Sequence, residues 1–178
     1  MNNKGFSLIE LIVIIAIMGV LVGGASLGIG LVFSKDAMKC ATRLNDSIYD
    51  ARANSMYKAG EFKLSIDNSG SANTATISQT DLTPVTSDTV YLDGVDSGKK
   101  TTISAKFVTE AVPAGTAISF PVNLTFDKAK GNVYFDVDAD GTYDDGIIVF
   151  DITPLRGNRT AKVQLVTTTG KHTIGEFE

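Results

Sequence analysis

The segment from Phe135 to Gly146 contains five aspartates, and the first three stand at every second position. Alternate aspartates in a glycine-containing loop can turn several oxygen atoms toward one hard cation, and Ca²⁺ prefers oxygen ligands. An acidic turn that joins two strands is the alternative, because Asp and Gly are common turn residues. The candidate calcium ligands are Asp136, Asp138, Asp140 and Asp144.

This acidic loop does not fit an EF-hand. An EF-hand loop ends in a bidentate glutamate and lies between two helices. Ile147 stands where that glutamate would be, and strands are expected on both sides. Calcium binding here is therefore expected to be weak, with a Kd of about 0.1 to 1 mM.

A single carboxylate lies near the start of a long apolar segment. Between Glu10 and Lys35 the chain has no ionisable side chain. A span of about 20 apolar residues crosses a bilayer, and a charge near its centre costs on the order of 2.5 to 3.5 kcal/mol. An acidic residue that is kept in such a segment indicates a functional role.

The arrangement around this carboxylate differs from a secretory signal peptide. A signal peptide has an apolar region of about 7 to 15 residues that is followed by a small-residue cleavage site. Here the apolar run is longer and its charge lies at the front. The short basic leader that ends at Gly5, then Phe6, Glu10 and the long apolar helix together resemble the type IV pilins and pseudopilins.

The resemblance implies specific processing and assembly roles. Residues 1–5 would be a leader that a membrane-embedded prepilin peptidase removes by cutting between Gly5 and Phe6, and Phe6 would then be N-methylated. Glu10 would meet the terminal amine of a neighbouring subunit, since an ammonium and a carboxylate attract more strongly away from water.

The same resemblance implies partners and a location. The partners would be the peptidase, other pilin or pseudopilin subunits, an assembly-platform membrane protein with its ATPase, and membrane lipid. The chain would be a single-pass membrane protein before assembly. It would afterwards belong to an extracellular or cell-envelope filament.

Glycines distinguish this apolar segment from many family members, which have a proline near the position of Leu27. Each glycine weakens a helix by up to about 1 kcal/mol relative to alanine, so this part of the helix could bend or unwind. Close helix packing through small residues is the alternative. The glycines are Gly19, Gly23, Gly24, Gly28 and Gly30.

The helix is expected in two parts: residues 6–34 as the transmembrane and assembly helix, and residues 35–60 as an amphipathic continuation. Gly60 is expected to end it. A stripe of residues spaced near 3.6 would cover a sheet. That stripe contains Ala37, Cys40, Ala41, Leu44, Ile48, Ala51 and Met56.

Charges on the other face of the amphipathic helix are ordered. Lys35, Lys39 and Arg43 recur at four-residue steps, and Asp46 and Asp50 follow them. Most such charge runs are solvated faces. The alternative is a basic band that meets an acidic band on an axially shifted neighbour.

Residues 61–178 are predicted to form a β-rich globular head, because apolar residues alternate with polar ones between turn signals. The expected fold class is α+β, with the long helix packed on an antiparallel β-sheet. The acidic loop and the strand before it also resemble the H-type minor pseudopilins. Candidate strands lie at 62–66, 75–78, 89–92, 101–108, 118–126, 132–136, 146–152, 161–168 and 172–174.

Composition and motifs give little support to an enzyme. The chain of 178 residues has one Cys, one His and a net charge of −4. It has no Gly-x-Ser-x-Gly elbow, phosphate loop or Cys-x-x-Cys pair, and spacing implies no partner for His172. Cys40 is expected to be a small buried hydrophobic residue, with no intrachain disulfide. Mild acidity argues weakly against nucleic acid as the main ligand.

Two classes of function follow from the sequence. The first is a structural subunit, pilin or minor pseudopilin, of a type IV pilus, a type II secretion pseudopilus or a competence pseudopilus. The second is a binding module at the membrane or a filament tip, which would act in adhesion or DNA uptake through loops of the head.

Overall fold

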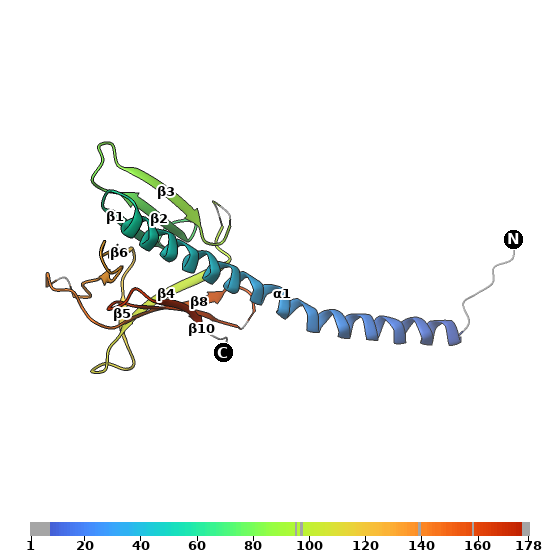
Figure 1. The fold of residues 1–178 in the computed structure, drawn as a ribbon. Coiled ribbons are helices and arrows are strands. Elements are labelled where there is room, and N and C mark those ends of the chain that lie inside the picture. The colour runs from blue at the N-terminus through green and yellow to red at the C-terminus, as the bar shows by residue number, and fades with distance from the viewer. Residues whose placement is uncertain (1–7, 95, 97, 139, 158, 176–178) are drawn as a thin grey trace.

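The computed structural model describes residues 8–94, 96, 98–138, 140–157 and 159–175. Of residues 24–34 it describes the backbone only. One helix, α1 (Leu8–Tyr57), contains 50 residues and is about 75 Å long at roughly 1.5 Å per residue. Its first part projects alone, and its second part lies against the strands (Figure 1). The helix is continuous through all five glycines.

The second part of α1 is amphipathic, as the residue spacing predicts. Six of the seven residues in the predicted stripe are buried, whereas Met56 is half-buried and Ser55 takes the buried position. Ser55 is tolerated there because its hydroxyl donates to the Ala51 carbonyl at 3.0 Å. The helix ends at Tyr57, and Gly60 follows with a φ of 129°, which favours glycine.

The first sheet has five antiparallel strands in the order β3-β2-β1-β6-β7. Its burial pattern alternates along β1 and β6, which is typical of strands with one face in the core. β3 lies at one edge and is largely exposed. The strands are β1 (Phe62–Asp67), β2 (Thr74–Gln79), β3 (Thr86–Tyr91), β6 (Val122–Phe126) and β7 (Val133–Tyr134).

The second sheet also has five antiparallel strands, in the order β10-β9-β8-β4-β5. Its longest pairing joins β4 and β8 over eight residues of each strand. The strands are β4 (Thr101–Val108), β5 (Thr116–Ile118), β8 (Ile147–Pro154), β9 (Ala161–Val166) and β10 (His172–Gly175).

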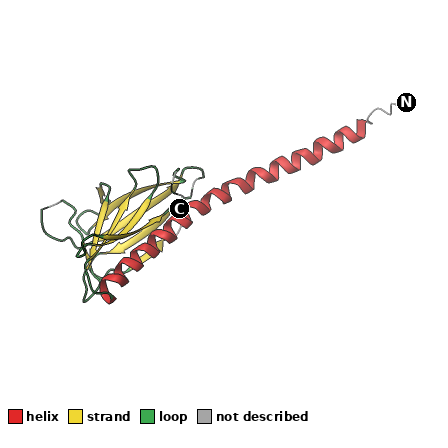
Figure 2. Cartoon of the chain, turned by 90° about the horizontal axis from the view of Figure 1, so that it is seen from above, coloured by secondary structure: helices red, strands yellow, loops and turns green. Residues whose placement is uncertain are grey.

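Both sheets pack against α1. The helix contacts β1 in the first sheet and β8, β9 and β10 in the second, and Figure 2 shows it running along one side of the strands. Leu44 and Ile48 of α1 share one buried cluster with Leu64 of the first sheet and Phe150 of the second. The helix therefore completes a core that the two sheets have in common.

The α+β class and the antiparallel pairing are confirmed, but two expectations are wrong. The head contains two sheets rather than one. The predicted strand 118–126 is in fact β5 and β6, which belong to different sheets. Pro121 separates them, and a proline has no N–H to donate to a strand ladder.

No helix in the part of the chain that the structure describes is long and apolar enough to be identified as a membrane span.

Candidate functional site

The processing residues and the assembly residue fall at the start of the chain. Gly5 and Phe6 lie outside the described residues. Glu10 lies in the first turn of α1, where a carboxylate is favoured by the positive end of the helix dipole. Its side chain is exposed beside Ile9, Val13 and Ile14.

Apolar side chains surround α1 on all sides near its start. Every large apolar side chain from Leu8 to Val22 is between 46% and 77% exposed. An exposed apolar surface of this extent is unusual for a soluble monomer and marks contact with lipid or with another chain. The residues are Leu8, Ile9, Leu11, Ile12, Val13, Ile14, Ile15, Ile17, Met18, Val20, Leu21 and Val22.

The acidic loop joins β7 to β8, and thus the first sheet to the second. Asp136, Asp138 and Asp144 each place one carboxylate oxygen within 4.8 Å of the others. Asp140 is not in this cluster, and its carboxylate accepts hydrogen bonds from the backbone N–H and hydroxyl of Thr142. The structure thus brings together three of the four predicted calcium ligands.

Hydrogen bonds within the loop hold two of these carboxylates in place. Asp136 accepts from the backbone N–H of Gly141 at 2.9 Å, and Asp144 accepts from that of Val137 at 2.9 Å. Bonds of this kind are typical of an acidic turn. They leave lone pairs on each carboxylate, so both the acidic turn and the calcium site are compatible with the geometry.

The hydroxyl of Thr142 holds the pKa of the Asp140 carboxyl below its usual value, and the backbone N–H of Thr142 adds to this effect. Asp140 therefore stays ionised at mildly acidic pH. Its role in the described structure is to shape the loop.

Thr167 anchors the end of the acidic loop, and sequence reasoning missed it. Its hydroxyl accepts from the N–H of Gly146 at 2.8 Å and lies 3.0 Å from the carbonyl of Asp144. Its backbone carbonyl accepts from the N–H of Val133 at 2.8 Å. The threonine-rich run after β9 offers no sequence signal for this contact.

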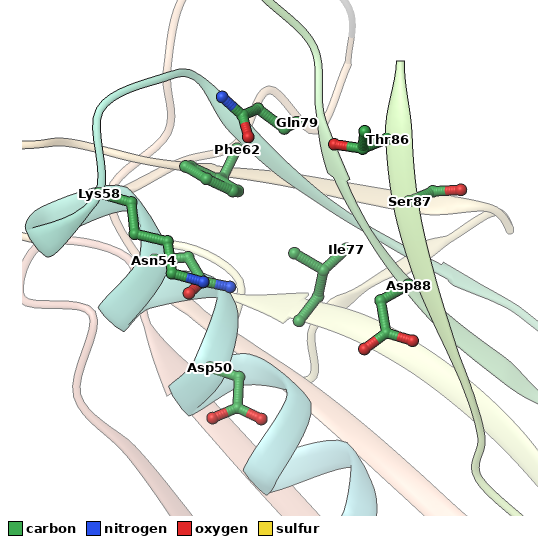
Figure 3. A pocket seen from close by; sticks show the side chains of 9 residues that line it. All are labelled: Asp50, Asn54, Lys58, Phe62, Ile77, Gln79, Thr86, Ser87 and Asp88. Atoms are coloured by element: carbon green, nitrogen blue, oxygen red, sulfur yellow. The ribbon is translucent and has the colours of Figure 1, made fainter. Parts of the chain in front are cut away.

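A groove lies between α1 and the β1-β2-β3 part of the first sheet (Figure 3). Asp50 of α1 and Asp88 of β3 lie on opposite walls, and Ile77 lies between them. The groove has a volume of about 510 Å³. No spacing in the sequence predicts it, because Asp50 and Asp88 are brought together only by the packing of α1 on the sheet.

Neither Cys40 nor His172 has the surroundings of a catalytic group. Cys40 is fully buried, and burial raises the pKa of its thiol to about 12. Nδ1 of His172 lies 3.2 Å from the Gly170 carbonyl, and its ring meets Tyr49 edge-on with centroids 6.3 Å apart.

Comparison with known proteins gives one match. Residues 1–26 match the prokaryotic N-terminal methylation motif. No curated protein and no solved structure matches the chain. The motif indicates a subunit that is processed by prepilin peptidase and assembles with other pilin subunits. It identifies the N-terminal segment of this chain as that of a type IV pilin or pseudopilin.

Proposed function

We propose that the chain is a structural subunit of a type IV pilus, a type II secretion pseudopilus or a competence pseudopilus. One observation carries the proposal: the methylation motif, residues 1–26, includes the start of a 50-residue helix whose first part is apolar and exposed on all sides. A filament of such subunits buries this surface between neighbouring helices.

The N-terminal part of the helix acts in two environments. Before assembly, residues 6–34 hold the subunit in the bilayer, where an α-helix satisfies its own backbone hydrogen bonds. A platform protein and its ATPase then move the subunit into the filament. Glu10 pairs with the N-methylated amine of Phe6 on a neighbouring subunit, and the apolar surroundings strengthen that attraction.

A binding module at a filament tip is the second candidate, and one feature of the head favours it. Tyr134 and Tyr143 stack with ring centroids 4.7 Å apart and border a groove of about 440 Å³ between β6 and the acidic loop. Exposed tyrosines often supply contact area for ligands. Recovery along sheared filaments supports a main structural subunit, whereas trace recovery at tips supports this second role.

The proposed processing is tested at the N-terminus of the assembled protein. Intact-mass and N-terminal peptide analysis of filaments from the native host should show loss of residues 1–5 and one added methyl on Phe6. A Gly5→Leu variant should stay full-length, because the peptidase site needs a small residue there. Full-length wild-type chain inside assembled filaments would overturn the proposal.

The role of Glu10 is tested by separating insertion from assembly. Glu10→Ala removes a charge that opposes insertion, so the variant should reach a near-normal level in the membrane. Its incorporation into filaments should fall sharply, and Glu10→Gln should fail in the same way. Ile9→Ala, which truncates the neighbouring side chain and keeps the Glu10 carboxylate, is the matched control. Normal incorporation of Glu10→Ala would show that the carboxylate has no docking role.

A further inference from the structure

In the described structure, β3 is the longest of the four strands that lie at the edges of the two sheets. It contains six residues, whereas the other edge strands, β7, β5 and β10, contain two, three and four. Within the described part of the chain, β3 pairs only with β2, in an unbroken register (Figure 1). It contains no proline or lysine, which commonly protect an edge. Such a strand is a template for the addition of another strand.

The hydrogen-bonding pattern identifies the backbone groups of β3 that face the free edge. The N–H of Leu92 donates to the Asn73 carbonyl at 2.9 Å, so these two residues form a hydrogen-bonded pair, and such pairs alternate along an antiparallel ladder. Asp88 therefore bonds to β2, whereas Ser87 and Thr89 direct their N–H and C=O groups outward. These four groups have the spacing that a further antiparallel strand needs.

Asp88 determines which strand fits this edge. Its side chain lies on the same face as that of its partner Ile77 and lines the groove beside α1. A residue added opposite Asp88 would form a non-hydrogen-bonded pair with it, the kind of pair in which side chains are closest. The chemistry of the groove therefore acts directly on that residue.

The groove favours a positive charge opposite Asp88. Asp50 of α1 faces Asp88 across the groove (Figure 3). In the described part of the chain, neither carboxylate has a hydrogen-bond partner or an ion-pair partner. Lys58 supplies the one ammonium that lines the groove, so the two carboxylates leave a net negative charge. A lysine or arginine has an apolar stem and a charged end, and thus suits a position beside Ile77.

We propose that β3 binds an extended segment of another protein as an added antiparallel strand, with a lysine or arginine of that segment opposite Asp88. Backbone hydrogen bonds to Ser87 and Thr89 supply affinity, and the groove supplies specificity. The residue two positions before the basic one faces half-buried Val90, where an apolar side chain fits. The inference goes beyond the proposed function, because it concerns the head alone and does not depend on assembly into filaments.

A second copy of β3 is disfavoured as the added strand. The antiparallel register that uses all four outward groups joins Ser87 of each copy to Thr89 of the other. It places the two Asp88 side chains directly opposite each other, and like charges at such a position are destabilising. A charge on the inner face of an edge strand is a common protection against self-pairing. A basic residue of a different protein converts this repulsion into attraction.

Binding of a synthetic peptide to the full chain in detergent tests the inference. The probe is a fluorescently labelled peptide, Ser-Thr-Val-Thr-Lys-Thr-Ser, whose lysine and valine would lie opposite Asp88 and Val90. Its anisotropy should show saturable binding. A peptide with glutamate in place of the lysine should bind about tenfold more weakly, because an attractive cross-strand pair becomes a repulsive one. A peptide N-methylated at both threonines beside the lysine keeps every side chain but loses the backbone donors, and should not bind.

Two substitutions at Thr89 separate backbone pairing from side-chain contact. Thr89→Pro removes an outward N–H without removing a bond to β2, and an edge strand tolerates proline in this orientation. Thr89→Ala keeps that N–H and removes only the side-chain hydroxyl, which lies 3.0 Å from that of Thr76 on the outer face. Thr89→Pro should abolish binding and Thr89→Ala should preserve it, with the circular dichroism of the wild-type chain retained in both.

Reversal of one charge tests the specificity. Asp88→Lys should bind the glutamate peptide more tightly than the lysine peptide, which is the opposite of the wild-type preference. Asp145→Lys is the control, because Asp145 is an exposed carboxylate that does not line the groove, and it should keep the wild-type preference.

Amide hydrogen exchange detects the added strand in the wild-type chain itself. In the free chain the amide of Asp88, which bonds to β2, should exchange slowly, whereas that of Thr89 should exchange fast. The lysine peptide should slow exchange at Thr89 and leave exchange at Asp88 unchanged.

Four outcomes would overturn the inference. Absence of saturable binding at millimolar peptide excludes the site. Equal binding of the N-methylated peptide, or unchanged exchange at Thr89, would show attraction between charges without an added strand. Slow exchange at Thr89 in the free chain that becomes fast on dilution would identify a second copy as the occupant. Failure of the N-terminal processing test would overturn the proposed function and leave these measurements unaffected.

Discussion

At the scale of single residues, Arg52 joins the helix to hairpins of both sheets. Its Nε donates to the Gly131 carbonyl at 3.1 Å, and its Nη2 donates to the Thr169 carbonyl at 3.0 Å. Gly131 precedes β7 and has a φ of 68°. A Cβ added there would collide with the guanidinium of Arg52. The planar guanidinium can serve two carbonyls at fixed angles, which an ammonium cannot.

Replacing Arg52 should destabilise the head. Arg52→Ala leaves two carbonyls without this donor, and we expect the free energy of unfolding to fall by about 1 to 3 kcal/mol. Arg52→Lys should recover part of the loss. Urea unfolding of the full chain in detergent, followed by circular dichroism, measures the change. Lys58→Ala, an exposed lysine just past the end of the same helix, is the control, and an equal midpoint for both alanine variants would contradict the bridging role.

Contacts of this kind lie beyond what residue spacing can predict. The sequence groups Arg43 with Lys35 and Lys39 as one basic band, yet Arg43 is half-buried and bonds to Leu92. Leu92 is 49 residues away in the chain. Periodicity identifies the side of a helix on which a residue lies, but it carries no information about distant carbonyls that folding brings to that side.

At the scale of elements, the spacing of apolar residues in the sequence predicts which faces of the helix and of the strands are buried. The buried stripe of α1 and the alternation in β4 follow from one face being covered. The division into two sheets depends on which strands pair, and that choice is made by contacts far apart in sequence. Residues 118–126 show the limit, since a continuous apolar pattern crosses from one sheet to the other at Pro121.

The acidic loop is an element whose stability should respond to calcium. Asp136, Asp138 and Asp144 repel one another at their observed spacing, and a cation bound only to the folded state would relieve that repulsion. A calcium concentration tenfold above Kd should add roughly 1.4 kcal/mol to the free energy of unfolding. Thermal unfolding of the full chain in millimolar calcium and in EDTA measures the effect.

Two variants locate the calcium effect within the loop. Asp138→Asn should abolish the calcium-dependent rise in Tm, because it removes one of the three clustered carboxylates. Asp145→Asn should keep the rise, because Asp145 is exposed and outside the cluster. An unchanged Tm for the wild-type chain would identify the loop as an acidic turn without a metal.

At the scale of the whole molecule, α1 joins its exposed apolar part to the head. Cys40 lies where the helix meets a buried polar network. The Thr101 hydroxyl lies 2.8 Å from Asp93 and 3.4 Å from the Cys40 sulfur, and the Asn73 amide donates to Asp93 at 2.8 Å. The thiol is thus covered by the sheets for as long as α1 stays docked.

Alkylation of Cys40 should therefore report the docking of α1 on the head. The thiolate is the reactive form, and burial raises the thiol pKa from 9.0 to about 12. At pH 8 we expect the full chain to react with iodoacetamide at least tenfold more slowly than the urea-unfolded chain. Thr101→Ala, which opens space beside the sulfur, should accelerate labelling. Equal rates for native and unfolded chain would contradict a docked helix.

The burial of the Cys40 thiol also makes the free energy of unfolding decrease at alkaline pH. The unfolded chain releases the Cys40 proton near its ordinary pKa, whereas the folded chain holds that proton until pH is about 12. The folded state therefore keeps its full stability below about pH 8.5 and loses part of it as pH rises from there. The urea midpoint of the wild-type chain should fall more between pH 8 and pH 10 than that of Cys40→Ala. A parallel fall in both chains would show that the Cys40 thiol is not the group that lowers stability at alkaline pH.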